Sequence, residues 1–354
     1  MTTRPLVSRR WSRRLTFALI AVVAVFAAAE LIVRLGGWAT LPAEGVFTDV
    51  YDVNYEMLPG AINPWSDVRE FLNNDGFRGK SLPIERRDGI ARIVSCGDST
   101  TFGACVRADQ AYTPLLENKL NARGVVVEAL NAGVPGTNLW QQTLLFERRL
   151  QNYRPDLVIL YTAPNLRADL ARLRGGLRSG AIWRDVRRGL ARSHIYRLLR
   201  HLIRPPSFED VLHQYLNQET AADRWAMPSN EVYAGALEDL LRLQTLCESI
   251  DCRLLIMPVV SRALVYGANE HGLHPGDPAW SVRKSQDHPR RFILNITAKN
   301  DIATVDPADV LLTASYREPM FLDSVHFTPA GHEEVAELLL EKICAGHFLP
   351  DACP

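Results

Sequence analysis

The sequence has little cysteine and little lysine, and it carries no net charge. Six cysteines in 354 residues are too few for a small disulfide-held scaffold. None of them shows the Cys-x2-Cys pairs or the Cys/His spacing of a zinc site. The 40 basic and 40 acidic side chains balance, which argues against a nucleic-acid-binding protein. Hydrophobic residues make up 47% of the chain, so it can build a core and is not a disordered or low-complexity chain.

The N-terminus has five arginines and no acidic residue in its first 14 positions, and an apolar run over Leu15–Ala29 follows. A membrane-spanning helix needs about 20 mainly apolar residues, and its basic flank stays in the cytoplasm. The pattern predicts a cytoplasmic basic tail over 1–14 and a transmembrane signal anchor over 15–35. The rest of the chain is then extracytoplasmic. The alternative is a signal peptide cut after Ala29, which would release a secreted form.

Disulfide bonds can form and persist in an oxidising extracytoplasmic compartment. Three cysteine pairs are close enough in sequence to bridge: Cys96 with Cys105, Cys247 with Cys252, and Cys344 with Cys353. The first pair fits two buried thiols equally well. The sequence does not fix the connectivity.

Beyond an extended connector over 36–88, rich in Pro, Gly, Asn and Asp, strand and helix patterns alternate. Such alternation predicts a parallel sheet with helices on both faces, in a domain over 89–354. An Arg-rich helical insertion over about 167–228 interrupts it. The predicted strands are 91–95, 125–130, 157–161, 254–257 and 302–305. The predicted helices are 112–121, 139–150, 232–250, 290–299 and 329–344.

Chemistry-bearing residues follow these strands. Ser99 stands in a Gly-Asp-Ser-Thr turn after the first strand, Gly133 and Asn165 follow the second and third, and Asp323 and His326 lie after the last. Each motif alone also fits a structural role, such as a capped turn or a glycine-rich loop. A serine hydroxyl becomes a nucleophile only beside a base that a carboxylate orients. Because parallel strands end at one edge of the sheet, we expect these residues to converge there.

This order of motifs resembles the SGNH (GDSL-type) hydrolase superfamily, over roughly 71–345. The segment Asn-Asn-Asp-Gly-Phe-Arg-Gly at 73–79 is similar to the lead-in of membrane-anchored bacterial members. The resemblance implies a flavodoxin-like three-layer α/β/α fold and a serine esterase site that uses no cofactor. The family's third motif is usually Gly-x-Asn-Asp, whereas this chain has Ala-Pro-Asn-Leu at 163–166. The amide donor is kept, but its neighbours differ.

The resemblance also assigns roles to individual residues. Ser99 would be the nucleophile, His326 the general base and then the acid, and Asp323 the group that orients the histidine. The oxyanion hole would consist of the Ser99 N–H, the Gly133 N–H and the Asn165 side chain. His332, six residues after His326, is expected to be a structural residue in the first turn of a helix.

The insertion carries eleven arginines and two acids over 167–204, with leucine and isoleucine near helical spacing. One interpretation is a solvated helix pair packed on the domain. The others are a helix that docks on anionic lipid headgroups and a lid that recruits an anionic glycan or lipid. Trp183, Tyr196 and Trp225 could line a sugar site, although scattered aromatic residues usually belong to a core.

Together these patterns predict an inner-membrane, single-pass protein with a periplasmic domain. Its activity would be hydrolysis of a short ester-linked acyl group, such as O-acetyl, on a cell-envelope or exported glycan or lipid. The alternatives are an O-acyltransferase that modifies an exported polysaccharide, and a non-catalytic envelope-binding protein that keeps the fold. The expected partners are the ester-bearing substrate and the membrane, with no nucleic acid.

Overall fold

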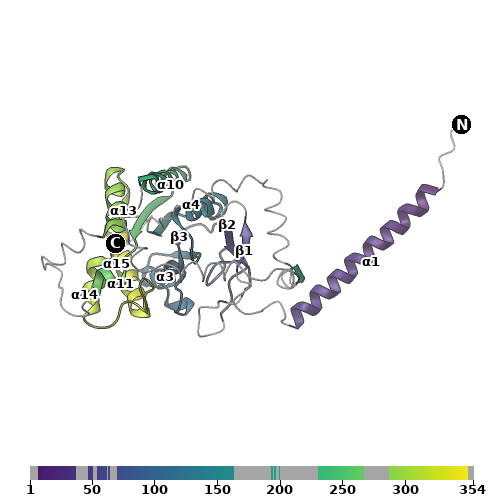
Figure 1. The fold of residues 1–354 in the computed structure, drawn as a ribbon, viewed down its shortest axis with the longest axis horizontal. Helices are drawn as coiled ribbons and strands as arrows, with labels where there is room; N and C mark the ends of the chain where they lie inside the picture. Colours follow the sequence, from purple (N-terminus) through teal and green to yellow (C-terminus); the bar gives the residue numbers. More distant parts are fainter. Residues whose placement is uncertain are drawn as a thin grey trace.

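A five-stranded parallel sheet forms the centre of the structure (Figure 1). The computed structural model describes residues 7–36, 47–50, 54–61, 63, 70–162, 193, 195–196, 199, 230–266 and 287–349. The spatial order of the strands is β4-β3-β5-β6-β7, with every neighbouring pair parallel. This is the flavodoxin-like order, in which the first strand lies between the second and the third. The strands are β3 (Ala91–Gly97), β4 (Val127–Gly133), β5 (Leu157–Thr162), β6 (Arg253–Pro258) and β7 (Ala303–Thr304).

Helices cover both faces of this sheet and create two apolar layers. Successive residues of a strand point to opposite faces, so Val94 enters one layer and Ile93 the other. The first layer lies under α4 (Leu139–Arg148), α10 (Asn230–Glu248) and α13 (His288–Lys299). The second lies under α3 (Tyr112–Ala122), α11 (Arg262–Tyr266), α14 (Ala308–Ser315) and α15 (Pro329–Ala345). The three-layer parallel α/β fold is therefore confirmed.

The strand predictions are confirmed, with small differences at the ends. The strand β7 is shorter than predicted, because it lies at the sheet edge and pairs with β6 only through Ala303 and Thr304. The helix α14 and the short α11 were not predicted. The N-cap of α13 is Asp287, whose side chain accepts a hydrogen bond from the Arg290 N–H.

The N-terminal helix α1 covers Val7–Leu35 and extends away from the rest of the chain (Figure 1). Its segment Thr16–Leu35 is long and apolar enough to cross a membrane, a property that signal sequences share. Two charged residues near its C-terminal end, Glu30 and Arg34, form an ion pair of 2.8 Å. Glu30 also accepts a hydrogen bond of 2.8 Å from the Ser193 hydroxyl. These partners lower the cost of placing a carboxylate in an apolar helix.

The connector contains a β-hairpin that the sequence did not predict. Its strands, β1 (Phe47–Val50) and β2 (Asn54–Met57), are antiparallel and lie between α1 and the sheet (Figure 1). Downstream, Leu58, Leu72 and Phe77 are buried in the same apolar layer as α4. This part of the connector is thus packed on the domain. The proposed domain boundaries stay a prediction.

Two of the three candidate disulfides are absent, because Cys96, Cys105, Cys247 and Cys252 are free thiols. Cys96 is buried in β3, whereas Cys105 is exposed on the loop after α2 (Ser99–Phe102). Cys247, on α10, and Cys252, directly before β6, are both buried, and the Cys252 N–H donates to the Cys247 carbonyl at 2.9 Å. Cys344 is disulfide-bonded, and Cys353 lies outside the described residues.

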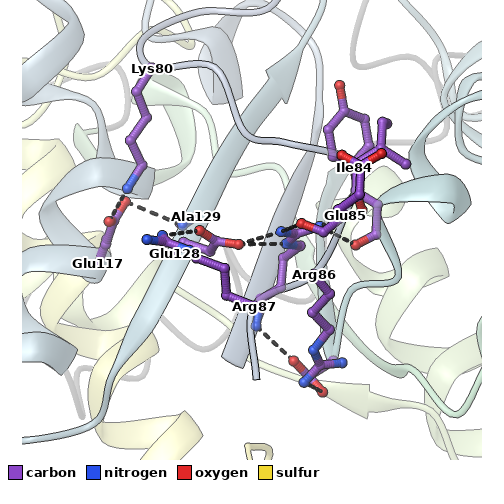
Figure 2. Close-up of polar contacts among 11 residues, drawn as sticks. Lys80, Ile84, Glu85, Arg86, Arg87, Glu117, Glu128 and Ala129 are labelled. Atoms are coloured by element: carbon purple, nitrogen blue, oxygen red, sulfur yellow. Dashed lines mark hydrogen bonds and ion pairs between the residues drawn. The ribbon is translucent and has the colours of Figure 1, made fainter. Parts of the chain in front are cut away.

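A buried ion pair between Arg92 and Glu128 lies at the edge of the sheet where the strands begin. The Arg92 and Glu128 side chains are 0% and 3% exposed, and Arg92 Nε lies 2.9 Å from Glu128 Oε1. Arg92 also donates to the Tyr153 carbonyl at 2.6 Å, and Arg87 pairs with the second oxygen of Glu128 at 2.8 Å. Figure 2 shows the Arg87–Glu128 contact next to the pair between Lys80 and Glu117. These contacts attach the end of the connector to β3 and β4.

We predict that Glu128→Ala lowers the free energy of unfolding by about 3–5 kcal/mol, because it leaves the buried Arg92 cation without its carboxylate. The measurement is urea unfolding of the detergent-solubilised chain. Asp109→Ala is the matched control: it removes the exposed partner of Arg107 and should cost less than about 0.5 kcal/mol. Equal effects of the two substitutions would contradict a structural role for the buried pair.

Candidate active site

Ser99 is the first residue of a one-turn helix that begins directly beyond β3. Asp98 is the N-cap residue, and its side chain accepts a hydrogen bond of 2.9 Å from the Thr100 N–H. Burial raises the pKa of Asp98, although this hydrogen bond and the nearby His326 oppose the shift. The first N–H groups of a helix have no acceptor within the helix and point outward. The turn therefore presents both the hydroxyl and the N–H of Ser99 at the carboxyl edge of the sheet.

Three side chains from two distant segments of the chain form a hydrogen-bonded relay at this edge. The Ser99 Oγ lies 2.7 Å from His326 Nε2, and His326 Nδ1 lies 2.6 Å from Asp323 Oδ2. With the imidazole protonated on Nδ1, that nitrogen donates to Asp323 and the Ser99 hydroxyl donates to Nε2. This is the geometry in which a histidine can take the proton of a serine nucleophile.

The loop that carries Asp323 and His326 is held by its own backbone. Phe321 and Phe327 form an antiparallel bridge, and the Leu322 N–H donates to the His326 carbonyl at 2.8 Å. The Phe327 ring is fully buried and packs against Tyr161 of β5 at 5.8 Å between ring centroids. The two polar side chains therefore project from a loop whose base belongs to the core.

The carboxylate of Asp323 is kept ionised by its neighbours. Its Oδ1 accepts hydrogen bonds of 2.9 Å from the N–H groups of Val325 and His326. Partial burial alone would raise the pKa of Asp323. The hydrogen bond and charge interaction with the His326 ring, together with the two N–H groups, hold it far below its usual value. A permanent carboxylate is what fixes the tautomer and orientation of the imidazole.

Gly133 lies at the end of β4, beside the serine turn, but its N–H is already engaged. It donates to the Asn131 Oδ1 at 3.1 Å, and this bond competes with the predicted oxyanion role. The position requires glycine for packing: a Cβ there would lie 2.3 Å from the Phe102 nitrogen. Gly133 thus lets α2 pack directly on β4, and its oxyanion role stays a prediction.

Asn165, the third predicted oxyanion donor, lies outside the described residues, as does most of the Arg-rich insertion. The roles assigned to both stay predictions.

Asn131 was given no role at the sequence level, yet its buried side chain donates to the Thr101 carbonyl at 2.8 Å. Its sequence signal is a polar residue near the carboxyl end of a mainly apolar strand. In the described part of the chain, no three His, Cys, Asp or Glu side chains gather as a metal site would require.

His332 is not part of the relay. It is 1% exposed in the first turn of α15, and its Nδ1 accepts a hydrogen bond of 3.3 Å from the Tyr112 N–H. Its ring packs edge-on against Phe327 at 5.5 Å. Burial, with smaller contributions from the Arg78 and His326 charges, lowers the pKa of His332 to about 3. The expectation of a structural histidine agrees with these contacts.

The fold and the residues at the carboxyl edge of the sheet define a class of protein. The chain is an α/β protein with a serine, a histidine and an aspartate in hydrogen-bonded sequence above a parallel sheet, as in serine hydrolases. Residues 95–334 match the GDSL-like lipase/acylhydrolase family. The chain belongs to this family and is a carboxylic ester hydrolase by class.

Solved structures show similar but distant folds. The acetyl xylan esterase AlAXEase is 15% identical with a TM-score of 0.44, over 71% of this chain and 99% of its own. TesA is 14% identical with a TM-score of 0.41, over 73% and 99%. A catalytic mutant of the acetylxylan esterase Axe2 from Geobacillus stearothermophilus is 15% identical with a TM-score of 0.42, over 72% and 94%. Among curated proteins none matches this chain.

We predict that His332 makes the fold sensitive to acid. Its pKa is lower in the folded chain, about 3, than the ordinary value of about 6.5 expected after unfolding. The unfolded chain therefore binds the extra proton between these values. The contribution of neutral His332 to the free energy of unfolding is complete above about pH 6.5 and is lost as the pH falls toward 3.

The measurement is urea unfolding of the wild type and of His332→Asn, which keeps an acceptor near Nδ1. Below about pH 6, the wild type should lose about 1.4 kcal/mol per pH unit relative to the variant. Parallel pH profiles of the two proteins would show that His332 does not remain neutral in the fold.

Proposed function

We propose that this protein is a serine esterase that removes a short acyl group, such as acetyl, from a cell-envelope or exported glycan or lipid. The observation that carries the proposal is the relay from Ser99 through His326 to Asp323, with contacts of 2.7 and 2.6 Å. A non-catalytic protein would have no need to keep these three side chains in hydrogen-bonding order. The short acyl group and the substrate class rest on the family resemblance and the expected location.

In the proposed reaction, the Ser99 Oγ attacks the ester carbonyl carbon while His326 Nε2 takes the hydroxyl proton. The imidazolium is stabilised by Asp323. The tetrahedral oxyanion lies near the Ser99 N–H, with Gly133 and Asn165 as the further donors proposed from the resemblance. For Gly133 to donate, its N–H must turn from Asn131 to the substrate.

The intermediate then collapses. The ester C–O bond breaks, and His326 passes its proton to the departing alkoxide, which leaves as the alcohol. Water attacks the acyl-enzyme with His326 again as the base, so the acid is released and Ser99 regains its proton. A sugar hydroxyl in place of this water would give the acyltransferase reaction.

The N-terminal helix and the insertion support a site close to a membrane. The Glu30 carboxylate of α1 accepts hydrogen bonds from the Ser193 hydroxyl at 2.8 Å and the Ile195 N–H at 3.0 Å. The described residues of the Arg-rich insertion thus contact the helix that would serve as the anchor. We propose that α1 holds the catalytic domain at the extracytoplasmic face of the inner membrane and that the arginines of the insertion bind anionic headgroups or substrate.

The serine assignment predicts that Ser99→Ala lowers the hydrolysis of 4-nitrophenyl acetate by about a thousand-fold or more, because no other group would form the acyl-enzyme. Asp323→Asn should cost up to about 10⁴-fold, because an amide favours the wrong imidazole tautomer. Ser324→Ala is the control, since Ser324 is exposed on the same loop. Matching rates for the wild type and Ser99→Ala would remove the assignment, and faster turnover with an added glycan acceptor would favour acyl transfer.

The anchor assignment predicts that the catalytic domain stays in the membrane fraction. An antibody against the C-terminal residues should detect the chain at its full mass there, and high salt should not release it, because about 20 apolar residues hold it in the bilayer. A shorter chain in the soluble extracytoplasmic fraction would instead establish a cleaved signal peptide.

A further inference from the structure

The helix that carries Ser99 is too short to support itself. It has one turn, Ser99–Phe102, whose last carbonyl groups have no N–H donors further along the helix. One-turn helices are unstable alone, because fixing the first turn costs more conformational entropy than one hydrogen bond returns. The position of the Ser99 hydroxyl therefore depends on the groups that bind the far end of the turn.

An arginine of the connector, Arg78, supplies most of the hydrogen-bond donors at the far end of this turn. The Arg78 side chain is 2% exposed, and its Nη1 donates to the Phe102 carbonyl at 2.9 Å and to the Gly103 carbonyl. Its Nη2 donates to the Val106 carbonyl, further along the same loop. The guanidinium also lies over the Phe102 ring, 4.8 Å from its centroid. The planar guanidinium of Arg78 thus donates to three carbonyl groups at the end of the Ser99 turn and in the loop after it.

Two neighbours complete the arrangement. Glu70 accepts from Arg78 Nη2 at 2.7 Å and from the Ala108 N–H at 2.8 Å, which orients the guanidinium and ties it to the end of the loop. Asn131 donates to the Thr101 carbonyl at 2.8 Å and pairs with Arg78 through an isolated antiparallel bridge. The turn is held from the connector on one side and from β4 on the other. Arg78 and Glu70 lie outside the residues 95–334 that match the family.

We propose that Arg78 is a positioning residue for catalysis: it fixes the serine turn so that the Ser99 hydroxyl meets His326. This inference rests on the proposed esterase function. Lysine cannot replace the arginine fully, because a point charge on a flexible stem does not span three carbonyl groups in one plane. A serine displaced by about 1 Å loses about 100-fold in rate. Substrate binding, which other residues provide, should change much less.

Arg149 offers a matched control. It also attaches the connector to the domain, through an ion pair of 2.6 Å with Glu56 and a hydrogen bond of 2.7 Å to the Asp75 carbonyl. Its guanidinium lies over the Phe77 ring at 4.7 Å. Arg149 follows α4 and makes none of the contacts to the serine turn that Arg78 makes. Arg149→Met should therefore weaken the same connector without moving Ser99.

The experiment uses the full chain in detergent, with Arg78→Met, Arg78→Lys and Arg149→Met. A fluorophosphonate counts the reactive serines, and stopped-flow hydrolysis of 4-nitrophenyl acetate gives the acylation rate per reactive serine. We expect Arg78→Met to lower kcat by about 10- to 100-fold with KM within about three-fold, and Arg78→Lys to give an intermediate rate. Arg149→Met should keep the wild-type rate per reactive serine.

The outcomes separate the two proposals. A wild-type chain that neither hydrolyses the ester nor reacts with the fluorophosphonate overturns the esterase function, and this inference with it. An active wild type with unchanged rates in both Arg78 variants overturns the inference alone. Equal losses in the Arg78 and Arg149 variants also overturn it, because Arg78 would then act only as a structural anchor. If Arg78→Met does not fold, the rate of Arg78→Lys is compared with that of Arg149→Met, and equal rates overturn the inference.

Discussion

A parallel sheet that is buried on both faces leaves only the ends of its strands in contact with water, and this constraint places the site. Helices cover β3 and its neighbours on either side, so a polar side chain on either face would meet apolar atoms. In the order β4-β3-β5-β6-β7 the chain reverses direction across the sheet beside β3. Loops that leave neighbouring strands diverge at such a point and leave room for a ligand. Ser99, which follows β3, stands at this point.

The strands and the position of Ser99 were accessible from the sequence for one physical reason. Buried parallel strands are short apolar runs between turns, and a residue that directly follows such a run must lie at the carboxyl edge. His326 lies beyond both β7 and α14, so its place beside Ser99, 227 positions away, was predicted from the resemblance to the SGNH family. The loop at 321–327 adds local order, because the spacing of three between Asp323 and His326 allows the carboxylate to reach the ring nitrogen and two backbone N–H groups.

The elements that the sequence did not predict are short and have weak end signals, and the role of Gly133 depends on a neighbouring helix. The hairpin β1–β2 lies in a polar stretch whose pattern resembles a linker, and α14 spans only Ala308–Ser315, with Pro307 as a weak N-cap. Gly133 was predicted as an oxyanion donor, and its lack of a side chain also provides space for the Phe102 backbone. A glycine has the same sequence signal in both cases. Only the neighbouring helix shows which group approaches it.

The connector has two attachments that act on different parts of the molecule. At one end it leads from α1, and at the other its Arg78 and Glu70 hold the loop that follows the Ser99 turn. The residues that match the family supply the serine, the histidine and the aspartate. Within that range Asn131 donates to the Phe102 carbonyl at 3.4 Å and the Val106 N–H donates to the Gly103 carbonyl at 3.3 Å, but both carbonyl groups accept shorter hydrogen bonds from Arg78, which lies outside it. Losing a donor to a buried carbonyl group is costly. The unit that positions Ser99 therefore begins upstream of the family match, in the segment that also joins it to the N-terminal helix.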